Sequence, residues 1–224
     1  MKRAGIVALL AGLAFVLYLC TQPAYTHRFR LTIEVETPDG IKTGSSVIET
    51  SAWESGNWGP IEARGIRRDF KGRAVFVDLG QGRNLVALLG FGPIGADQHK
   101  LFSITRAALA SGEKTDDWNE EFRLKGRCVL SNDYVPALAT FKNLNDPASA
   151  VRVESSDIAN IFGPGFAFRQ AFLETTNESV SGNIEKILPW WRSPGRPAEV
   201  AYRAWRKGSI VGPTLSPEEL FQKE

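Results

Sequence analysis

The sequence predicts an α+β fold, in which an N-terminal transmembrane helix precedes a β-rich, mainly antiparallel domain with two or three short helices. Three observations lead to this prediction. The first residues form an apolar run without charge, the residues from position 29 onward alternate with the period of a strand, and Gly and Pro (21 and 12 residues) recur between the alternating segments. A chain of 224 residues holds one such domain beside an anchor.

Residues 1–24 are predicted to form an uncleaved membrane anchor. Ala4–Cys20 carries no charged side chain, and as a helix it would span about 25 Å, the short end of what a bilayer requires. Two alternatives stay open. A cleaved signal peptide would have its best site after Ala24, where the small residue that should stand three positions before the cut is missing. A lipoprotein signal at Cys20 would need a small residue in place of Leu19.

The charges at the N-terminus predict the orientation of this anchor. Lys2 and Arg3 add to the amino terminus on the short side of the apolar run, which favours a cytoplasmic N-terminus. The following domain would then be periplasmic, and the chain would belong to the inner membrane of a Gram-negative bacterium. Without Lys2 and Arg3 the 27 basic residues fall to 25, which equals the number of acidic residues, so no nucleic-acid binding is expected.

Alternation with period two predicts the first strands. Phe29–Val35 alternates apolar and polar side chains, Pro38-Asp39-Gly40 predicts a turn, and Ile41–Thr50 returns as the second strand of a hairpin. Trp53–Arg68 begins as a loop and regains strand character near Ile61.

A second hairpin is predicted in the middle of a sheet. Ala74–Leu79 and Leu85–Phe91 are apolar on both faces, and Gly80-Gln81-Gly82 joins them as a turn. The remaining predicted elements are helices at His99–Ala110, Ser155–Phe162 and Ser181–Leu188, and strands at Arg123–Leu130, Ala137–Lys142 and Phe166–Thr176.

The β-rich domain is predicted to extend over residues 25–191, and a Pro-rich C-terminal tail to follow over residues 192–224. The tail differs from the domain because its apolar residues show weak periodicity and because prolines interrupt it repeatedly. Two short helices are expected within it, Pro197–Lys207 and Pro217–Gln222.

No motif in the sequence assigns catalytic, cofactor-binding or metal-binding residues. Two cysteines and two histidines are too few for a disulfide framework or a zinc module. Gly44-Ser45-Ser46 lacks the flanking pattern of a serine nucleophile, and the acidic pairs Asp116-Asp117 and Glu120-Glu121 lie in a polar loop. Cys128 is expected as a buried strand residue, and Asp78 as an acceptor for turn amides.

One surface is predicted to contact a protein partner or the membrane. Between residues 190 and 207 five basic residues oppose a single acidic one, and aromatic side chains are interleaved with them. Trp beside Arg is typical of headgroup interfaces and of protein–protein contacts; packing of the rings over the domain is the alternative. This candidate C-terminal patch consists of Trp190, Trp191, Arg192, Arg196, Tyr202, Arg203, Trp205, Arg206 and Lys207.

Three stretches of the sequence, LTIEVETPDGIKTGSSVIE, AVFVDLGQGRNLVALL and FGPGFAFRQAFLETT…IEKILPWW, resemble a family of single-anchor proteobacterial membrane proteins with no assigned activity. The resemblance covers most of residues 1–191 and leaves the tail outside. It implies a membrane-anchored β-rich protein, and because the shared stretches are turn and core signatures, it implies no mechanism.

The sequence therefore favours a non-enzymatic envelope protein that is held to the membrane by its N-terminal helix and binds a protein partner or another envelope ligand, without a cofactor. The alternative is a hydrolase of an envelope polymer, which would need two carboxylates brought together in a cleft.

Overall fold

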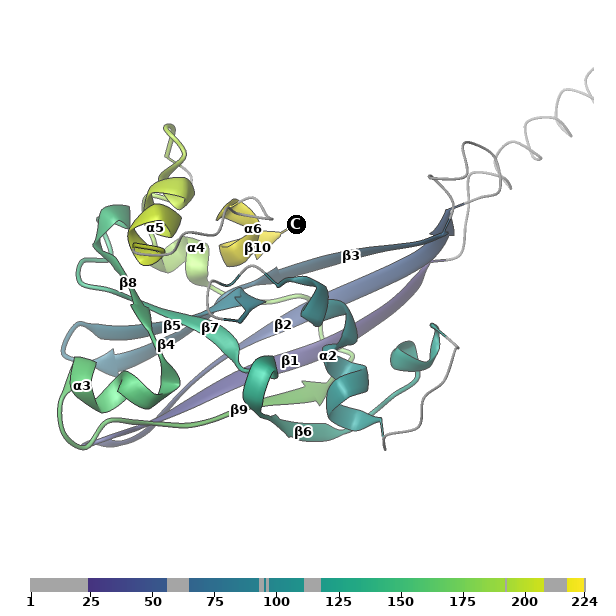
Figure 1. Ribbon diagram of the computed structural model, residues 1–224, viewed down its shortest axis with the longest axis horizontal. Coiled ribbons are helices and arrows are strands. Elements are labelled where there is room, and N and C mark those ends of the chain that lie inside the picture. Colours follow the sequence, from purple (N-terminus) through teal and green to yellow (C-terminus); the bar gives the residue numbers. More distant parts are fainter. Residues whose placement is uncertain are drawn as a thin grey trace, which may run out of the picture.

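The computed structural model describes residues 24–55, 65–92, 95, 97–110, 118–191, 193–207 and 217–223. Two antiparallel sheets and several short helices form the fold (Figure 1), which confirms the predicted α+β class. The predicted anchor lies outside the described residues and stays a prediction. Among the described residues, no helix is long and apolar enough to cross a membrane.

The larger sheet has six strands in the order β10-β3-β2-β1-β9-β6, and the smaller sheet has four in the order β4-β5-β7-β8. Neighbouring strands run antiparallel in both sheets. The strands are β1 (Tyr25–Thr37), β2 (Gly40–Ser55), β3 (Gly65–Arg73), β4 (Val75–Gly80), β5 (Arg83–Phe91), β6 (Arg127–Leu130), β7 (Pro136–Phe141), β8 (Ala150–Val153), β9 (Ala167–Thr175) and β10 (Gln222–Lys223).

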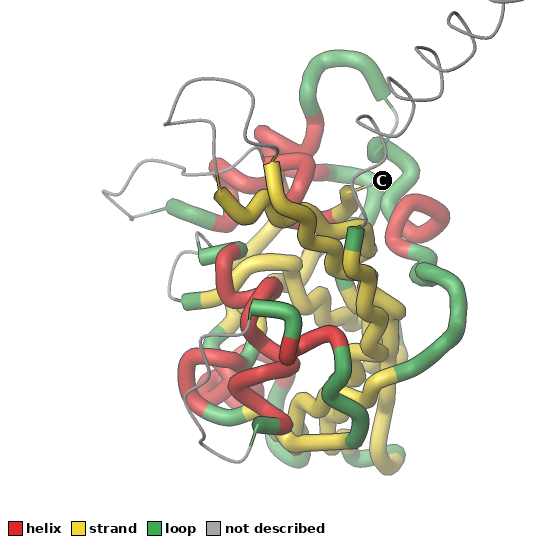
Figure 2. The backbone as a smooth tube through the Cα atoms, turned by 90° about the vertical axis from the view of Figure 1, so that its right-hand side faces the viewer, coloured by secondary structure: helices red, strands yellow, loops and turns green. Residues whose placement is uncertain are grey.

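The helices lie at the margins of the stacked strands (Figure 2). The α-helices are α2 (His99–Leu109), α3 (Ile158–Phe162), α4 (Ile184–Ile187), α5 (Pro197–Trp205) and α6 (Pro217–Phe221). Single turns of 3-10 helix are η2 (Glu120–Phe122), η3 (Asn132–Tyr134), η4 (Pro147–Ser149) and η5 (Ser155–Asp157).

The two predicted hairpins are confirmed. β1 pairs with β2 from Tyr25↔Ala52 to Thr37↔Gly40, and Gly40 takes the positive φ of 105° that the tight turn requires. β4 and β5 pair across the turn at Gly80-Gln81-Gly82, where the Asp78 carboxylate accepts a hydrogen bond from the Gly80 amide (2.8 Å), as expected.

The main core lies between the two sheets. Phe29, Leu31, Ile33 and Val35 all point from β1 into it, because alternate side chains of a strand share one face. Gly44 permits the sheets to approach, since a Cβ at this position would lie 2.1 Å from the carbonyl oxygen of Phe76 in β4. A side chain there would collide with the backbone of the opposing sheet.

A second core lies on the other side of the smaller sheet. Val86 and Leu88 in β5 point into it and pack against side chains from α4, α5 and α6. β5 is therefore covered on both faces, as its sequence predicted, whereas Phe76 in β4 is only half-buried. The predicted tail contributes Tyr202, Trp205 and other residues to this core, and the boundary between residues 191 and 192 stays a prediction.

The structure differs from the predicted elements in several places. The sequence predicts strand character near Ile61, a position outside the described residues, whereas most of β3 lies later in the chain. The sequence analysis predicts no strand at the positions of β8 and β10. β3 has the sequence GIRRDFKGR, in which Phe70 is the one large side chain buried in the main core, so the strand shows no apolar alternation in the sequence. β8 and β10 have four residues and two residues, too few for a periodic signal.

Candidate functional site

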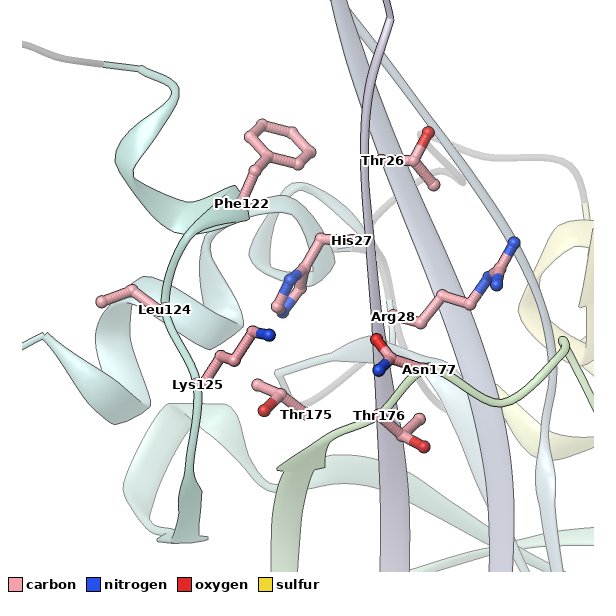
Figure 3. A pocket seen from close by; sticks show the side chains of 9 residues that line it. All are labelled: Thr26, His27, Arg28, Phe122, Leu124, Lys125, Thr175, Thr176 and Asn177. Atoms are coloured by element: carbon pink, nitrogen blue, oxygen red, sulfur yellow. The ribbon is translucent and has the colours of Figure 1, made fainter.

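The candidate site lies where β1 extends beyond its neighbour β9. Phe29 pairs with Thr175, the last residue of β9, but β1 begins four residues earlier, at Tyr25. On the far side of β9 the chain leading into β6 continues alongside, so β1 and residues 122–125 flank the strand position that β9 leaves empty (Figure 3).

A cavity of about 600 Å³ occupies this position, and we refer to it as the His27 pocket. Side chains from both walls reach into it: His27 from β1 and Lys125 from the opposite segment extend toward each other (Figure 3). The residues that line the pocket are Thr26, His27, Arg28, Phe122, Leu124, Lys125, Thr175, Thr176 and Asn177.

His27 is the buried titratable group of this pocket. It continues the inward register of Phe29, and only 8% of its surface is exposed. Its Nε2 atom is buried and has no hydrogen-bond partner among the described residues. Burial lowers the pKa of the His27 imidazole below its ordinary value of 6.5, and the nearby Lys125 ammonium lowers this pKa further. A buried nitrogen without a hydrogen-bond partner is costly, and a bound water or ligand that paired with it would remove that cost.

Two threonines at the base of the pocket keep hydroxyl donors available. Thr175 Oγ1 accepts a hydrogen bond from the Gly126 amide (3.0 Å), and Thr176 Oγ1 accepts one from the Glu178 amide (3.2 Å). A hydroxyl that has accepted a hydrogen bond can still donate its own proton. Together with the Lys125 ammonium, these groups suit a ligand that carries only acceptor atoms.

Arg28 contributes little charge to the interior of the pocket. Its side chain extends to the other face of β1 (Figure 3), where its Nε lies 2.6 Å from the Glu49 carboxylate. No Asp or Glu is among the described residues that line the pocket. The pocket interior therefore combines Lys125 with a neutral imidazole and has no carboxylate to oppose an anion.

The wall that carries Phe122 is held in place by ion pairs. Glu121 in η2 is buried, and its carboxylate accepts a hydrogen bond from Arg68 in β3, whose Nη1 also donates to the Phe102 carbonyl (3.2 Å). Burial raises the pKa of Glu121 above its ordinary value of 4.5, while the Arg68 guanidinium acts in the opposite direction. The Oε2 atom of the neighbouring Glu120 lies 3.8 Å from the Nε atom of Arg106 in α2.

The carboxylate pairs considered for an enzyme do not form a catalytic dyad in the described part of the chain. Asp116-Asp117 lies outside the described residues, and Glu120-Glu121 is paired with arginines. A smaller cavity of about 210 Å³ contains Asp133 and Glu154, but both are exposed and paired, with Lys100 (3.4 Å) and Arg152 respectively. Nor do any three His, Cys, Asp or Glu of the described ranges form a group that could hold a metal ion.

The aromatic members of the C-terminal patch lie mostly in the second core. Trp190, Tyr202 and Trp205 are buried, and Trp191 is half-buried against Phe221, with ring centroids 5.5 Å apart. The indole nitrogens of Trp190 and Trp205 donate to the carbonyls of Leu144 and Leu138, each at 2.9 Å. These rings are therefore committed to packing, which was the alternative considered for them.

The basic members of the patch remain on the surface. Arg196 and Arg203 are exposed and lie beside Glu199. The Arg206 guanidinium lies over the Tyr202 ring, 5.3 Å from its centroid, and Lys207 is exposed. Arg192 lies outside the described residues. Lys207 lines an open cavity of about 520 Å³ together with Lys142 and Arg152. A partner contact through these cations stays a prediction, but it would lack the aromatic rings.

The other singled-out side chains have structural roles. The Ser46 hydroxyl donates to the Ser181 carbonyl (2.6 Å) and is buried, so it is not an exposed nucleophile. Cys128 lies in β6 as expected, but it is half-buried rather than buried, because β6 is the edge strand of its sheet.

His27 is the site residue that sequence reasoning missed. It lies close to the predicted anchor, and because it is two residues before Phe29 it shares the inward face of the strand. No local pattern could have brought Lys125 or Thr175 to it, because they meet His27 only through sheet pairing.

Comparisons with family models, with curated proteins and with solved structures each found no match for this chain, so the resemblance to the single-anchor family stays a prediction.

Proposed function

We propose that this protein is a membrane-anchored envelope protein that binds a ligand through an anionic group, and that it acts as a binding module rather than as an enzyme. The observation that carries the proposal is the His27 pocket. Lys125, two threonines and His27, whose buried Nε2 has no hydrogen-bond partner among the described residues, all line one cavity. A phosphate or carboxylate oxygen would accept hydrogen bonds from these groups and would neutralise the lysine.

The pocket also has a size that suits a ligand headgroup rather than a single ion. Its volume of about 600 Å³ falls in the range of small-molecule sites. Binding an anion would favour the protonated imidazole, which then donates from Nε2, so the ligand would turn the unsatisfied atom into a charged donor. Specificity beyond the anionic group would come from the polar side chains around it.

The most direct binding experiment uses the small number of histidines in the chain. The full chain, labelled with ¹⁵N-histidine and kept in detergent micelles, shows imidazole signals from His27 and His99 alone. Titration with inorganic phosphate should shift the His27 signals saturably and leave those of His99 unmoved. Lys125→Gln should weaken binding by about tenfold or more, which corresponds to the loss of one charge-assisted hydrogen bond.

Lys142→Gln is the matched control, since it removes the same charge from an exposed lysine that lines a different cavity. It should leave phosphate binding unchanged. An unmoved His27 signal, or equal weakening by both lysine variants, would contradict the proposed site.

The anchoring part of the proposal is tested separately. Alkaline phosphatase fused after residue 224 should be active, and the mature protein should retain residues 1–24. An inactive fusion would reverse the topology, and a mature chain that begins near Tyr25 would remove the anchor.

A further inference from the structure

We infer that the ligand of the His27 pocket is the phosphate-bearing headgroup of an anionic membrane lipid. This inference rests on the proposed function, both on its anion site and on its membrane anchor. It adds the source of the anion: a lipid of the membrane that holds the chain, rather than a soluble phosphate compound.

The first argument is the short connection between the predicted anchor and the pocket. The apolar run ends at Cys20, and Thr26 already lines the pocket. A fully extended chain advances at most about 3.6 Å per residue, so these six steps reach no more than about 22 Å. If Ala4–Cys20 spans the bilayer, the pocket is confined to the region just above the headgroup layer.

The second argument is the aromatic rim beside the pocket. Tyr25 is 40% exposed, and its ring lies against Trp118, edge to face with ring centroids 5.3 Å apart, and against Phe122 at 5.9 Å. Phe122 is itself a lining residue of the pocket. Tyr and Trp are favoured at the boundary between lipid and water, where an apolar ring and a polar atom are both accommodated.

The third argument is the charge of the segment that forms the outer wall. Arg123, Lys125 and Arg127 are exposed in the five residues that lead from η2 into β6. The Arg127 guanidinium lies 3.8 Å above the Phe172 ring. The Lys125 side chain, in contrast, is directed into the pocket (Figure 3). A basic residue near an anionic membrane surface is attracted to it, so this segment favours anionic over zwitterionic lipid.

The position of the C-terminal patch supports the same orientation. Figure 1 places α5 near the end of the sheet where β1 finishes, far along the long axis from the beginning of β1. A short connection from the anchor to Tyr25 therefore directs the His27 pocket toward the bilayer and the exposed cations of α5 away from it. In this orientation the membrane contact lies at the His27 pocket rather than at the C-terminal patch.

The test uses the full chain in nanodiscs, labelled with ¹⁵N-histidine. Discs of phosphatidylcholine alone are compared with discs that also contain phosphatidylglycerol. The His27 imidazole signals should differ between the two discs and the His99 signals should not. Lys125→Gln should abolish the difference, Lys125→Arg should retain it, and Lys142→Gln should leave it unchanged. Lys125 is exposed, so these variants do not disturb the core.

A soluble phosphate is the competing source, and glycerol 3-phosphate added to phosphatidylcholine discs tests it. If glycerol 3-phosphate shifts His27 while phosphatidylglycerol does not, the lipid inference is overturned and the proposed anion site stands. If neither ligand shifts His27, both proposals fail. A lipid-dependent shift that persists in Lys125→Gln would report surface charge rather than occupancy of the pocket, and would also overturn the inference.

Discussion

The Phe122 ring meets the His27 imidazole edge to face, with ring centroids 6.5 Å apart. The contact joins the first residues of β1 to a single turn of 3-10 helix nearly a hundred positions later in the chain. Because Phe122 also lines the pocket, the shape of the pocket depends on where η2 lies. Its position in turn depends on Glu121 and Arg68, which tie η2 to β3.

We predict that Arg68→Met destabilises the folded protein. The substitution leaves the buried Glu121 carboxylate without its guanidinium partner, and breaking a buried pair in this way costs about 3–5 kcal/mol when both groups are fully buried. Arg68 is partly exposed, so we expect about 1–3 kcal/mol, measured by urea unfolding of the full chain at pH 7. The double variant Arg68→Met/Glu121→Gln should recover most of the loss, because no buried charge remains.

The loss of stability in Arg68→Met should depend on pH, and the pKa of Glu121 determines in which direction. Burial already raises the pKa of Glu121, and removing Arg68 raises it further, so the folded variant holds the proton more tightly than the unfolded chain above pH 4.5. The destabilisation by Arg68→Met should therefore grow as the pH rises from acidic values toward pH 7. A variant as stable as the wild type at pH 7 would show that the ion pair does not hold η2.

His27 should make the folded protein sensitive to acid. Its pKa is lowered by burial, so below pH 6.5 the unfolded chain binds a proton more readily than the folded chain. The contribution of neutral His27 is fully present above pH 6.5 and is lost as the pH falls toward the lowered pKa. In the absence of added anions, His27→Gln should reduce this loss, measured as the free energy of unfolding on either side of pH 6.5.

Substitution of Lys125 provides a second test of the link between the lowered pKa of His27 and the sensitivity of the folded protein to acid. Because its ammonium lowers the pKa of His27, Lys125→Gln should also reduce the sensitivity to acid, while Lys142→Gln should not. Equal acid sensitivity in wild type and His27→Gln would contradict the buried position of the imidazole.

Gly44→Ala is expected to disrupt the contact between the two sheets. A Cβ at this position would lie 2.1 Å from the Phe76 carbonyl oxygen, so β4 must move away from β2. Overpacking of this kind costs about 1–3 kcal/mol or more, because the obstacle is backbone rather than a flexible side chain. The exposed neighbour Ser45 gives the control: Ser45→Ala should change the stability by about 0.5 kcal/mol or less.

Leu88→Ala should cost about 3–4 kcal/mol, because Leu88 is buried in the second core and its truncation leaves a cavity. Phe76 lies in the same predicted hairpin but is only half-buried, so Phe76→Ala should cost less, about 1–2 kcal/mol. Val129, 55% exposed on the edge strand β6, is the control position for both. A loss at Val129→Ala equal to that at Leu88→Ala would contradict the assigned burial.

Much of the fold could be predicted from the sequence because its strands alternate clearly. β1 and β2 expose one polar face, and β5 is apolar throughout because both of its faces are covered. The burial of the tail aromatics had a weaker sequence signal. Ala198, Ala201, Tyr202 and Trp205 share the buried face of α5, but this single short repeat is only a weak periodic signal in a tail that prolines interrupt.

The candidate site was not predictable in the same way. His27 carries a local signal, because it shares the register of Phe29, but an empty strand position has no sequence pattern. The pocket exists because β9 ends at Thr175 while β1 and the segment at Lys125 continue on either side. Only the pairing of three strands, distant in the sequence, brings these groups together.

The most direct test of the proposed anion site is the pKa of His27, measured from the imidazole NMR signals of the full chain in micelles with and without saturating phosphate. Without an anion, burial and Lys125 should hold this pKa below 6.5. A phosphate bound beside the imidazole favours its charged form, so the pKa of His27 should rise when phosphate is present. A pKa that phosphate leaves unchanged would contradict an anion site at His27.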